Sequence, residues 1–155
     1  MRIKDCMKRN VVSIPASATI ARAAGIFVKS HVGVLPVVDD LGKPIGIIRL
    51  SDLLSLELPD FVKLVAVVDF VHNFGAVETT RPEAEQLGRP ITTLMESVTT
   101  VEEESGLLRA YALMLQHNVS DIPVVNEIGG LVGIVSRVDI GAAILSAWPA
   151  ERKTP

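Results

Sequence analysis

Apolar and polar positions along the chain alternate with two different periods. Between residues 19 and 28, apolar residues recur every three or four positions, which is the spacing of one face of a helix. Thr19 stands just before this stretch and can cap the helix. Its apolar positions are Ile20, Ala23, Ala24, Phe27 and Val28. A second stretch with the same spacing has Leu107, Leu108, Tyr111, Met114 and Leu115, so two amphipathic helices are predicted.

Short β-branched runs follow each of these helices. The runs Leu35–Val38 and Ile45–Ile48 are separated by a turn containing Gly42, a pattern typical of a β-hairpin. A second hairpin is predicted from Ile122–Val125 and Leu131–Val135, with Gly129 and Gly130 between them. We also expect a short strand before each helix and a closing helix after each hairpin. The strands are 11–14 and 98–101, and the helices are 52–56 and 139–147.

These elements are two copies of one sequence unit. The segment Pro36–Asp52 aligns without a gap onto Pro123–Asp139 at a constant offset of 87, with seven of seventeen positions identical. The offset extends upstream, where it pairs Ile14 with Val101 and Phe27 with Met114. A repeat of this kind predicts a repeated structural unit.

The predicted fold class is α/β (α+β), with two β-α-β-β-α units. A unit of this size buries too little surface to be stable alone, so we expect the two to pack by pseudo-twofold symmetry, with sheets facing each other and helices outside. The seam between them is a natural binding cleft. We divide the chain into a first unit (1–58), a helical insert and linker (59–90), a second unit (91–150) and a C-terminal tail (151–155).

The insert contains a predicted helix at 59–74 with a wide apolar arc, followed by a polar stretch at 78–90 that is typical of a linker. Such an arc needs more than one packing surface. Docking against the chain's own units is one interpretation. A subunit interface or a groove for a partner is the other, and we favour it.

Composition and charge narrow the possible functions. The net charge is −3 and the 15 Lys and Arg residues are dispersed, so we expect no nucleic-acid binding. No apolar run approaches the ~20 residues of a membrane span. The single cysteine, Cys6, excludes an intramolecular disulfide, and the short basic start lacks the apolar core of a signal peptide, so we expect a cytoplasmic protein. The three histidines lack metal-ligand spacing, and no catalytic motif is present, so we expect neither a metal site nor enzymatic activity.

The repeated motifs resemble those of the CBS (cystathionine-β-synthase) domain pair, or Bateman module. Units of that family end in G-h-h-[S/T]-x-x-D, where h is apolar, and the second copy matches it in full at Gly133–Asp139. The first copy, Gly46–Asp52, keeps the glycine and the aspartate but has Arg49 in place of the hydroxyl. Openings similar to h-x-D-h-M occur at 3–7 and 91–95, and an apolar-Pro-Val segment begins each hairpin, at Leu35–Val37 and Ile122–Val124.

The resemblance implies a binding site for an adenosine-type nucleotide. In the family, the motif aspartate binds the ribose hydroxyls, the Ser or Thr contacts phosphate, and apolar residues hold the adenine. The implied second-copy residues are Asp139, Ser136, Arg137 as a possible countercharge, Ile122, Pro123, Val98, Thr99 and Thr100. The implied first-copy residues are Asp52, Arg49, Leu35, Pro36, Val12 and Ser13.

Two of these assignments have simpler alternatives. Ser136 and Asp139 also have the spacing of a helix capping box, which needs no ligand. Arg49 is either a solvated strand-end residue or a guanidinium that reaches a phosphate, and Ser51–Asp52 is an alternative cap of the following helix, one step later. We therefore expect the second copy to hold the better nucleotide site.

The leading functional hypothesis is a regulatory sensor that binds AMP, ADP, ATP or a relative such as S-adenosylmethionine. It would signal to an unknown effector protein in trans, and the resemblance implies a homodimer. The alternative is a ligand-free dimerisation or interaction scaffold.

Overall fold

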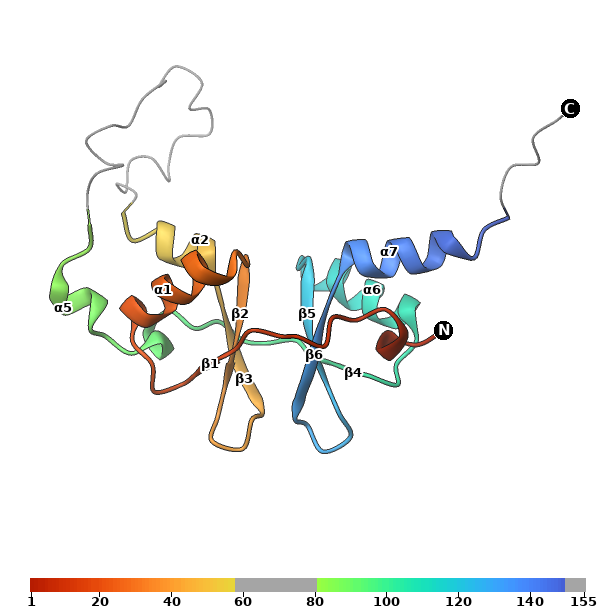
Figure 1. Ribbon diagram of the computed structural model, residues 1–155, viewed down its shortest axis with the longest axis horizontal. Coiled ribbons are helices and arrows are strands. Elements are labelled where there is room, and N and C mark those ends of the chain that lie inside the picture. The colour runs from red at the N-terminus through yellow and green to blue at the C-terminus, as the bar shows by residue number, and fades with distance from the viewer. Residues whose placement is uncertain (58–80, 150–155) are drawn as a thin grey trace, which may run out of the picture.

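The computed structural model describes residues 1–57 and 81–149. The predicted insert helix at 59–74 lies outside these residues. The described chain forms two three-stranded sheets that face each other at the centre of the molecule, with helices on the outer side of each (Figure 1). This arrangement confirms the predicted fold class.

The first unit contains β1 (Ile14–Pro15), α1 (Ile20–Ser30), β2 (Val34–Val38), β3 (Pro44–Arg49) and α2 (Leu50–Leu54). The second contains β4 (Val101–Glu102), α6 (Leu107–Gln116), β5 (Asp121–Val125), β6 (Leu131–Ser136) and α7 (Arg137–Ser146). In both sheets the outer short strand is parallel to the middle strand, and the other two strands form the predicted antiparallel hairpin. The registers match as well, since Val37 pairs with Gly46 and Val124 with Gly133.

Each hydrophobic core is completed by a segment from the other half of the sequence. A 3-10 turn at Ile3–Asp5 begins the first arm, which we define as residues 3–8, and a second at Ile91–Thr93 begins the second arm, residues 91–96. Ile3 and Met7 are buried in the core of the second unit, whereas Ile91 and Met95 pack in the core of the first. The two arms are therefore exchanged between the units.

The exchange is fixed by antiparallel backbone pairs between each arm and the motif strand of the other unit. Lys8 N–H donates to the Ile134 carbonyl, and Ile134 N–H donates to the Lys8 carbonyl, both over 2.9 Å. Ile47 and Glu96 make the equivalent pair, with both distances at 3.0 Å. These bonds satisfy main-chain groups on the free edge of each hairpin, which would otherwise be unpaired.

The motif glycines provide the space that the arms occupy. A Cβ added to Gly133 would lie 2.8 Å from the Lys8 carbonyl oxygen and 2.9 Å from Met7 Sδ. A Cβ on Gly46 would overlap the Met95 side chain. The glycine of the repeated motif is thus required by the docking of the exchanged arm.

The helices bury narrower faces than the sequence predicted. On α1 the buried residues are Ile20, Ala23 and Phe27, and on α6 they are Leu107, Ala110 and Met114. These sets are related by the repeat offset of 87. The expected core residues Val28 and Leu108 are instead 76% and 73% exposed, and Leu115 and Tyr111 are also exposed, because they lie one step around the helix from the stripe that touches the sheet.

Several predicted boundaries are displaced. The short strands begin at Ile14 and Val101, so residues 11–13 and 98–100 run without strand pairing. The closing helices start at Leu50 and Arg137, two residues earlier than predicted, because the motif aspartate is the third helical residue rather than the cap. The predicted linker also carries a short helix, α5 (Ala84–Leu87), and the Arg89 carbonyl beyond it accepts a hydrogen bond from Ile20 N–H over 3.0 Å.

The steric role of Gly133 predicts a loss of stability in Gly133→Ala. The added methyl group must displace the first arm, and overpacking of this kind costs about 1–3 kcal/mol. Gly25→Ala is the matched control, since Gly25 lies within α1 and a Cβ added there would have no neighbour within 4 Å. Chemical denaturation should show a small gain in that control, up to about 1 kcal/mol. Equal unfolding free energies for the two variants would contradict the arm-docking role.

Candidate functional site

The Ser136 site consists of Ser136, Asp139 and Lys8, and it lies where β6 passes into α7. Ser136 caps α7, with its hydroxyl oxygen accepting from Asp139 N–H over 3.1 Å. Asp139 Oδ2 accepts in return from Ser136 N–H (2.9 Å) and from the Ser136 hydroxyl (2.8 Å). The capping box considered from the sequence is therefore present, and it fixes the orientation of the carboxylate.

The other carboxylate oxygen of Asp139 faces the exchanged arm. Oδ1 lies 3.8 Å from Lys8 Nζ, and the Lys8 side chain is 66% exposed. This distance is longer than a hydrogen bond, so Lys8 is only loosely held. The site thus brings together one carboxylate oxygen and one ammonium group from different halves of the chain.

Cys6 lies close enough to this site to respond to its charge. Partial burial raises the pKa of the Cys6 thiol, and the negative charges of Asp139 and Asp5 raise it further. The thiol is therefore held in its protonated, poorly nucleophilic form at neutral pH.

The first copy of the motif has the same backbone but different chemistry. Asp52 Oδ2 accepts from Arg49 N–H over 2.7 Å, as Asp139 does from Ser136, so α2 begins directly after Arg49 and Ser51 is not its cap. The Arg49 guanidinium forms an ion pair with Glu96 of the second arm. Burial raises the pKa of Asp52; the hydrogen bond from Arg49 opposes this shift, while the nearby charge of Glu96 adds to it.

A pocket of about 410 Å³, which we name the Arg49 pocket, opens beside this ion pair. It is lined by residues from both units: Ile47, Arg49, Glu96, Ser97, Val98, Thr99, His117, Val119, Asp121 and Pro123. Four of them were predicted from the sequence, namely Arg49, Val98, Thr99 and Pro123. Arm exchange explains why Val98 and Thr99 line a pocket with Arg49 of the other copy, although their place in the sequence groups them with Ser136 and Asp139 of their own copy.

The remaining predicted residues differ in burial and in the contacts that their side chains make. Leu35 and Ile122 are fully buried core side chains, and Pro36 is also buried. Val12, Ser13 and Thr100 are half-buried in the unpaired segments before β1 and β4. Arg137, predicted as a countercharge, turns to the end of α6, where Nε donates to the Val119 carbonyl (3.0 Å) and a terminal nitrogen to that of Met114 (3.3 Å).

Sequence reasoning missed Lys8 and Glu96, the arm residues that face the two motifs. A signal for them exists, since each directly follows the methionine of an h-x-D-h-M-like opening. It could be used only with the knowledge that the arms cross to the other unit. His117 and Asp121, which also line the Arg49 pocket, gave no sequence signal.

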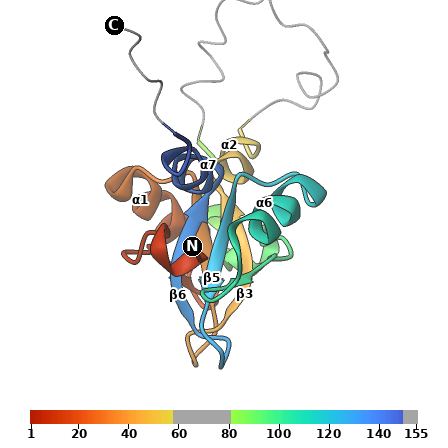
Figure 2. The same ribbon diagram turned by 90° about the vertical axis from the view of Figure 1, so that its right-hand side faces the viewer.

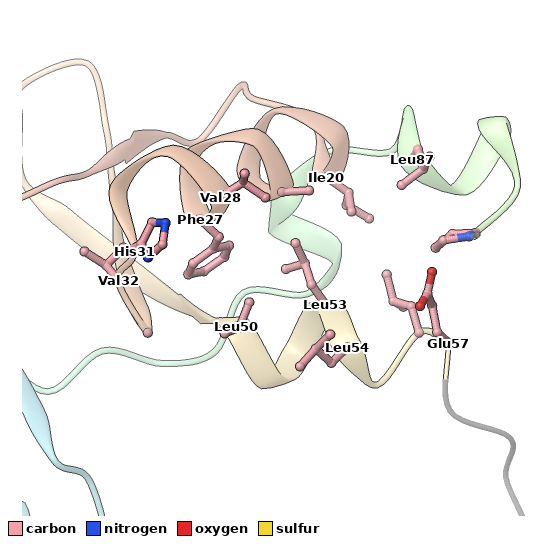
Figure 3. Close-up of a pocket in the computed structure, with 14 residues that line it drawn as sticks. Ile20, Phe27, Val28, His31, Val32, Leu50, Leu53, Leu54, Glu57 and Leu87 are labelled. Carbon is pink, nitrogen blue, oxygen red and sulfur yellow. The ribbon is translucent and has the colours of Figure 1, made fainter. Parts of the chain in front are cut away.

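A separate apolar groove of about 770 Å³ lies between α1 and α2 (Figure 3). Phe27, Leu53 and Leu54 line it, and Leu87 of α5 lies at one end. Glu57 and Pro82, which flank the undescribed residues 58–80, are also part of its lining. The groove offers few polar groups, so it lacks the donors and acceptors that orient a nucleotide.

Residues 1–57 and 81–149 hold neither a metal cluster nor a membrane-spanning helix. Within them, no group of three or more His, Cys, Asp or Glu side chains is placed to hold a metal ion. No helix in this part of the chain has the length and apolar character needed to cross a membrane.

Alignments with curated relatives cover most of the chain. Uncharacterized protein MJ1426 of Methanocaldococcus jannaschii is 27% identical over 163 residues, covering 94% of this chain and 92% of that protein. Uncharacterized protein MJ1404 of the same organism is 27% identical over 140 residues, covering 90% of this chain. The L-aspartate semialdehyde sulfurtransferase of this organism is 25% identical over 138 residues, covering 89% of this chain. This chain spans only 31% and 22% of the length of these last two proteins.

Solved structures share the fold. CBSX2 in complex with AMP is 25% identical, with a TM-score of 0.69, and the match covers 94% of this chain and 96% of that one. The CBS domain pair of protein MJ0100, in complex with 5′-methylthioadenosine and S-adenosyl-L-methionine, is 24% identical with a TM-score of 0.66, covering 96% and 98% of the two chains. The CBS domain family itself matches residues 3–58 and 91–146, which is more than half of the chain. The chain therefore belongs to the CBS domain family and contains two CBS domains.

Proposed function

We propose that this chain is a regulatory, non-catalytic module that binds an adenosine nucleotide at the Ser136 site. The observation that carries the proposal is the position of Asp139, whose Oδ2 is held by the capping box while Oδ1 faces Lys8 of the other unit. A carboxylate oriented in this way can accept hydrogen bonds from the vicinal hydroxyls of a ribose. Lys8 then lies where a phosphate on the same ligand can pair with it.

Of the two solved structures named above, CBSX2 supports a phosphorylated ligand. CBSX2, a chain of similar length and fold, was crystallised in complex with AMP. In the present chain, Lys8 of the first arm and the adjacent Arg9 supply positive charge, although Arg9 also lies 3.9 Å from Glu103. AMP, ADP and ATP all present a phosphate to these groups, and AMP is the ligand that we would test first.

Signalling in trans follows if the ligand favours one packing of the two units over another. The Ser136 site takes Asp139 from the second unit and Lys8 from the first arm, so a bound ligand bridges that unit and the arm that connects it to the first unit. A ligand shifts a conformational equilibrium only by its difference in affinity for the two states. A bridging site provides such a difference, and an effector protein that contacts the outer helices would sense it.

We further propose that the chain forms a homodimer through the outer faces of α6 and α7. Leu108 and Trp148 are 73% and 66% exposed, and both line a shallow apolar depression of about 510 Å³ together with Ile144 of α7. Apolar side chains concentrated on one face of a protein favour an interface. This surface also gives the scaffold hypothesis a specific basis, because it would operate with or without a nucleotide.

Asp139→Ala is expected to weaken AMP binding by about 10- to 100-fold, since hydrogen bonds to a charged group contribute about 1.5–3 kcal/mol. Isothermal titration calorimetry measures this loss directly. Because the substitution also removes a cap of α7, the unfolding free energy should fall by about 1 kcal/mol, and the titration must be run well below the melting temperature. Glu85→Gln, at a side chain 86% exposed, is the control. Unchanged AMP affinity in Asp139→Ala would exclude the Ser136 site.

The single cysteine gives a second test of the same site. Because the charge of Asp139 helps to raise the pKa of Cys6, Asp139→Asn should lower that pKa and speed alkylation by iodoacetamide at pH 7–8. Saturating AMP should slow alkylation of the wild-type protein, since its phosphate adds negative charge and covers the arm. An alkylation rate that neither the substitution nor AMP alters would argue against a ligand beside Cys6.

The dimer proposal predicts that Leu108→Glu dissociates the protein, because the substitution places a charge in an apolar interface. Sedimentation equilibrium should show a dimer for the wild type and a monomer for the variant at the same concentration. Leu41→Glu is a matched control, as Leu41 is 78% exposed at the tip of the first hairpin and outside the proposed interface. A monomeric wild-type protein at 100 μM, roughly the upper limit for a useful affinity, would refute the interface.

A further inference from the structure

The two exchanged arms place opposite charges at equivalent positions. Lys8 pairs through its backbone with Ile134 of β6, and Glu96 pairs in the same antiparallel manner with Ile47 of β3. Each arm side chain therefore stands beside the motif of the other unit. One motif faces a cation and the other faces an anion.

The motif residues differ in charge in the opposite sense to the arm residues. The position that carries the neutral hydroxyl of Ser136 in the second unit carries the guanidinium of Arg49 in the first. If the cation had simply moved from the arm in one site to the motif in the other, each site would still offer one positive charge to a phosphate. The two sites would then be equivalent. The contacts of Arg49 decide whether that equivalence holds.

Arg49 is paired with carboxylates of the chain itself. Its guanidinium forms an ion pair with Glu96, and its backbone N–H donates to Asp52 over 2.7 Å. Asp52 and Glu96 are close enough for their charges to interact. Asp121 of β5 and His117 also line the pocket, so its lining holds two carboxylates, those of Glu96 and Asp121, together with one guanidinium and one imidazole.

The Ser136 site has no comparable occupant among the described residues. Lys8 approaches Asp139 only to 3.8 Å and is 66% exposed, whereas the Arg49 side chain is 30% exposed and directly paired. An entering phosphate can approach Lys8 without removing a bonded partner. At Arg49 it must displace the Glu96 carboxylate and then remain beside the carboxylates of Glu96 and Asp121, which line the pocket and repel it.

We propose that the Arg49 pocket selects an adenosine-type ligand without negative charge, either a neutral nucleoside or one that carries a cationic group, and that Glu96 is the residue that determines this specificity. The inference rests on the proposed function, because it concerns the second of two related sites. The chain would then sense two classes of adenosine compound, a phosphorylated one at Ser136 and an unphosphorylated one at Arg49.

A purely structural role for the Arg49–Glu96 pair makes a different prediction. In that case the pair only holds the second arm against β3, and its removal would weaken every ligand equally or none. Both side chains are partly exposed, and ion pairs of this kind contribute little to stability, so Glu96→Gln should remain folded. Ligand selectivity is therefore the readout that separates the two roles.

The experiment uses calorimetric titration of the full chain with AMP and with adenosine. Asp139→Ala weakens the Ser136 site as predicted above, so that the tightest binding measured in this background is that at the Arg49 pocket. In this background adenosine should bind about tenfold more tightly than AMP, or better, which corresponds to about 1.4 kcal/mol. Adding Glu96→Gln should improve AMP affinity by a similar factor and leave adenosine affinity nearly unchanged. Adding Glu85→Gln, which removes a carboxylate paired with Arg89 outside the pocket, should change neither.

The outcomes distinguish this inference from the proposed function. If Asp139→Ala loses AMP binding, but adding Glu96→Gln restores none or improves both ligands equally, the charge selectivity is refuted and the proposed function stands. If Asp139→Ala leaves AMP affinity unchanged, the Ser136 assignment fails; a gain for AMP alone on adding Glu96→Gln still supports selectivity at Arg49. If neither compound binds any of the proteins, both proposals are refuted.

Discussion

The close contact between each exchanged arm and the motif strand of the other unit is the constraint on which the rest of the structure depends. Two backbone hydrogen bonds join Lys8 to Ile134, and the absence of a side chain on Gly133 lets the arm approach. The same contact buries Ile3 and Met7 in the second core. Neither unit completes its hydrophobic core from its own contiguous sequence, so the pair folds as one cooperative body. Figure 2 shows the first arm lying across the second unit.

The same constraint determines the chemistry of both sites. In each unit the last β-strand of the hairpin passes directly into a helix whose first turn is capped. The repeat gives both helix starts nearly the same backbone. The charge beside each helix start comes from the arm of the other unit, as Lys8 in one case and Glu96 in the other. Pseudo-symmetry therefore fixes where the sites lie, while two arm residues that differ in charge make them chemically unlike.

The repeat made most of the fold predictable from the sequence. Local signals were sufficient for the hairpins, for the Thr19 cap and for the capping box at Ser136, because each depends on residues a few positions apart. The partners of each arm were not predictable in this way. An offset of 87 says which residues correspond, but not that Val98 lies with Arg49 rather than with Ser136. For the same reason Leu108 looked like a core residue, since periodicity does not show how much of a helix the sheet covers.

Under the proposed function, ligand binding and the arm exchange would be coupled, because Lys8 takes part in both. Lys8 contributes its backbone to the contact with β6 and its ammonium group to the surroundings of Asp139. A phosphate that draws Lys8 away from Asp139 acts on the residue that closes the sheet edge, and hence on the position of Met7 in the second core. Packed cores respond to such displacements by changing between discrete arrangements rather than by deforming smoothly. The arm is therefore the element through which binding at Ser136 would alter the packing of the two units.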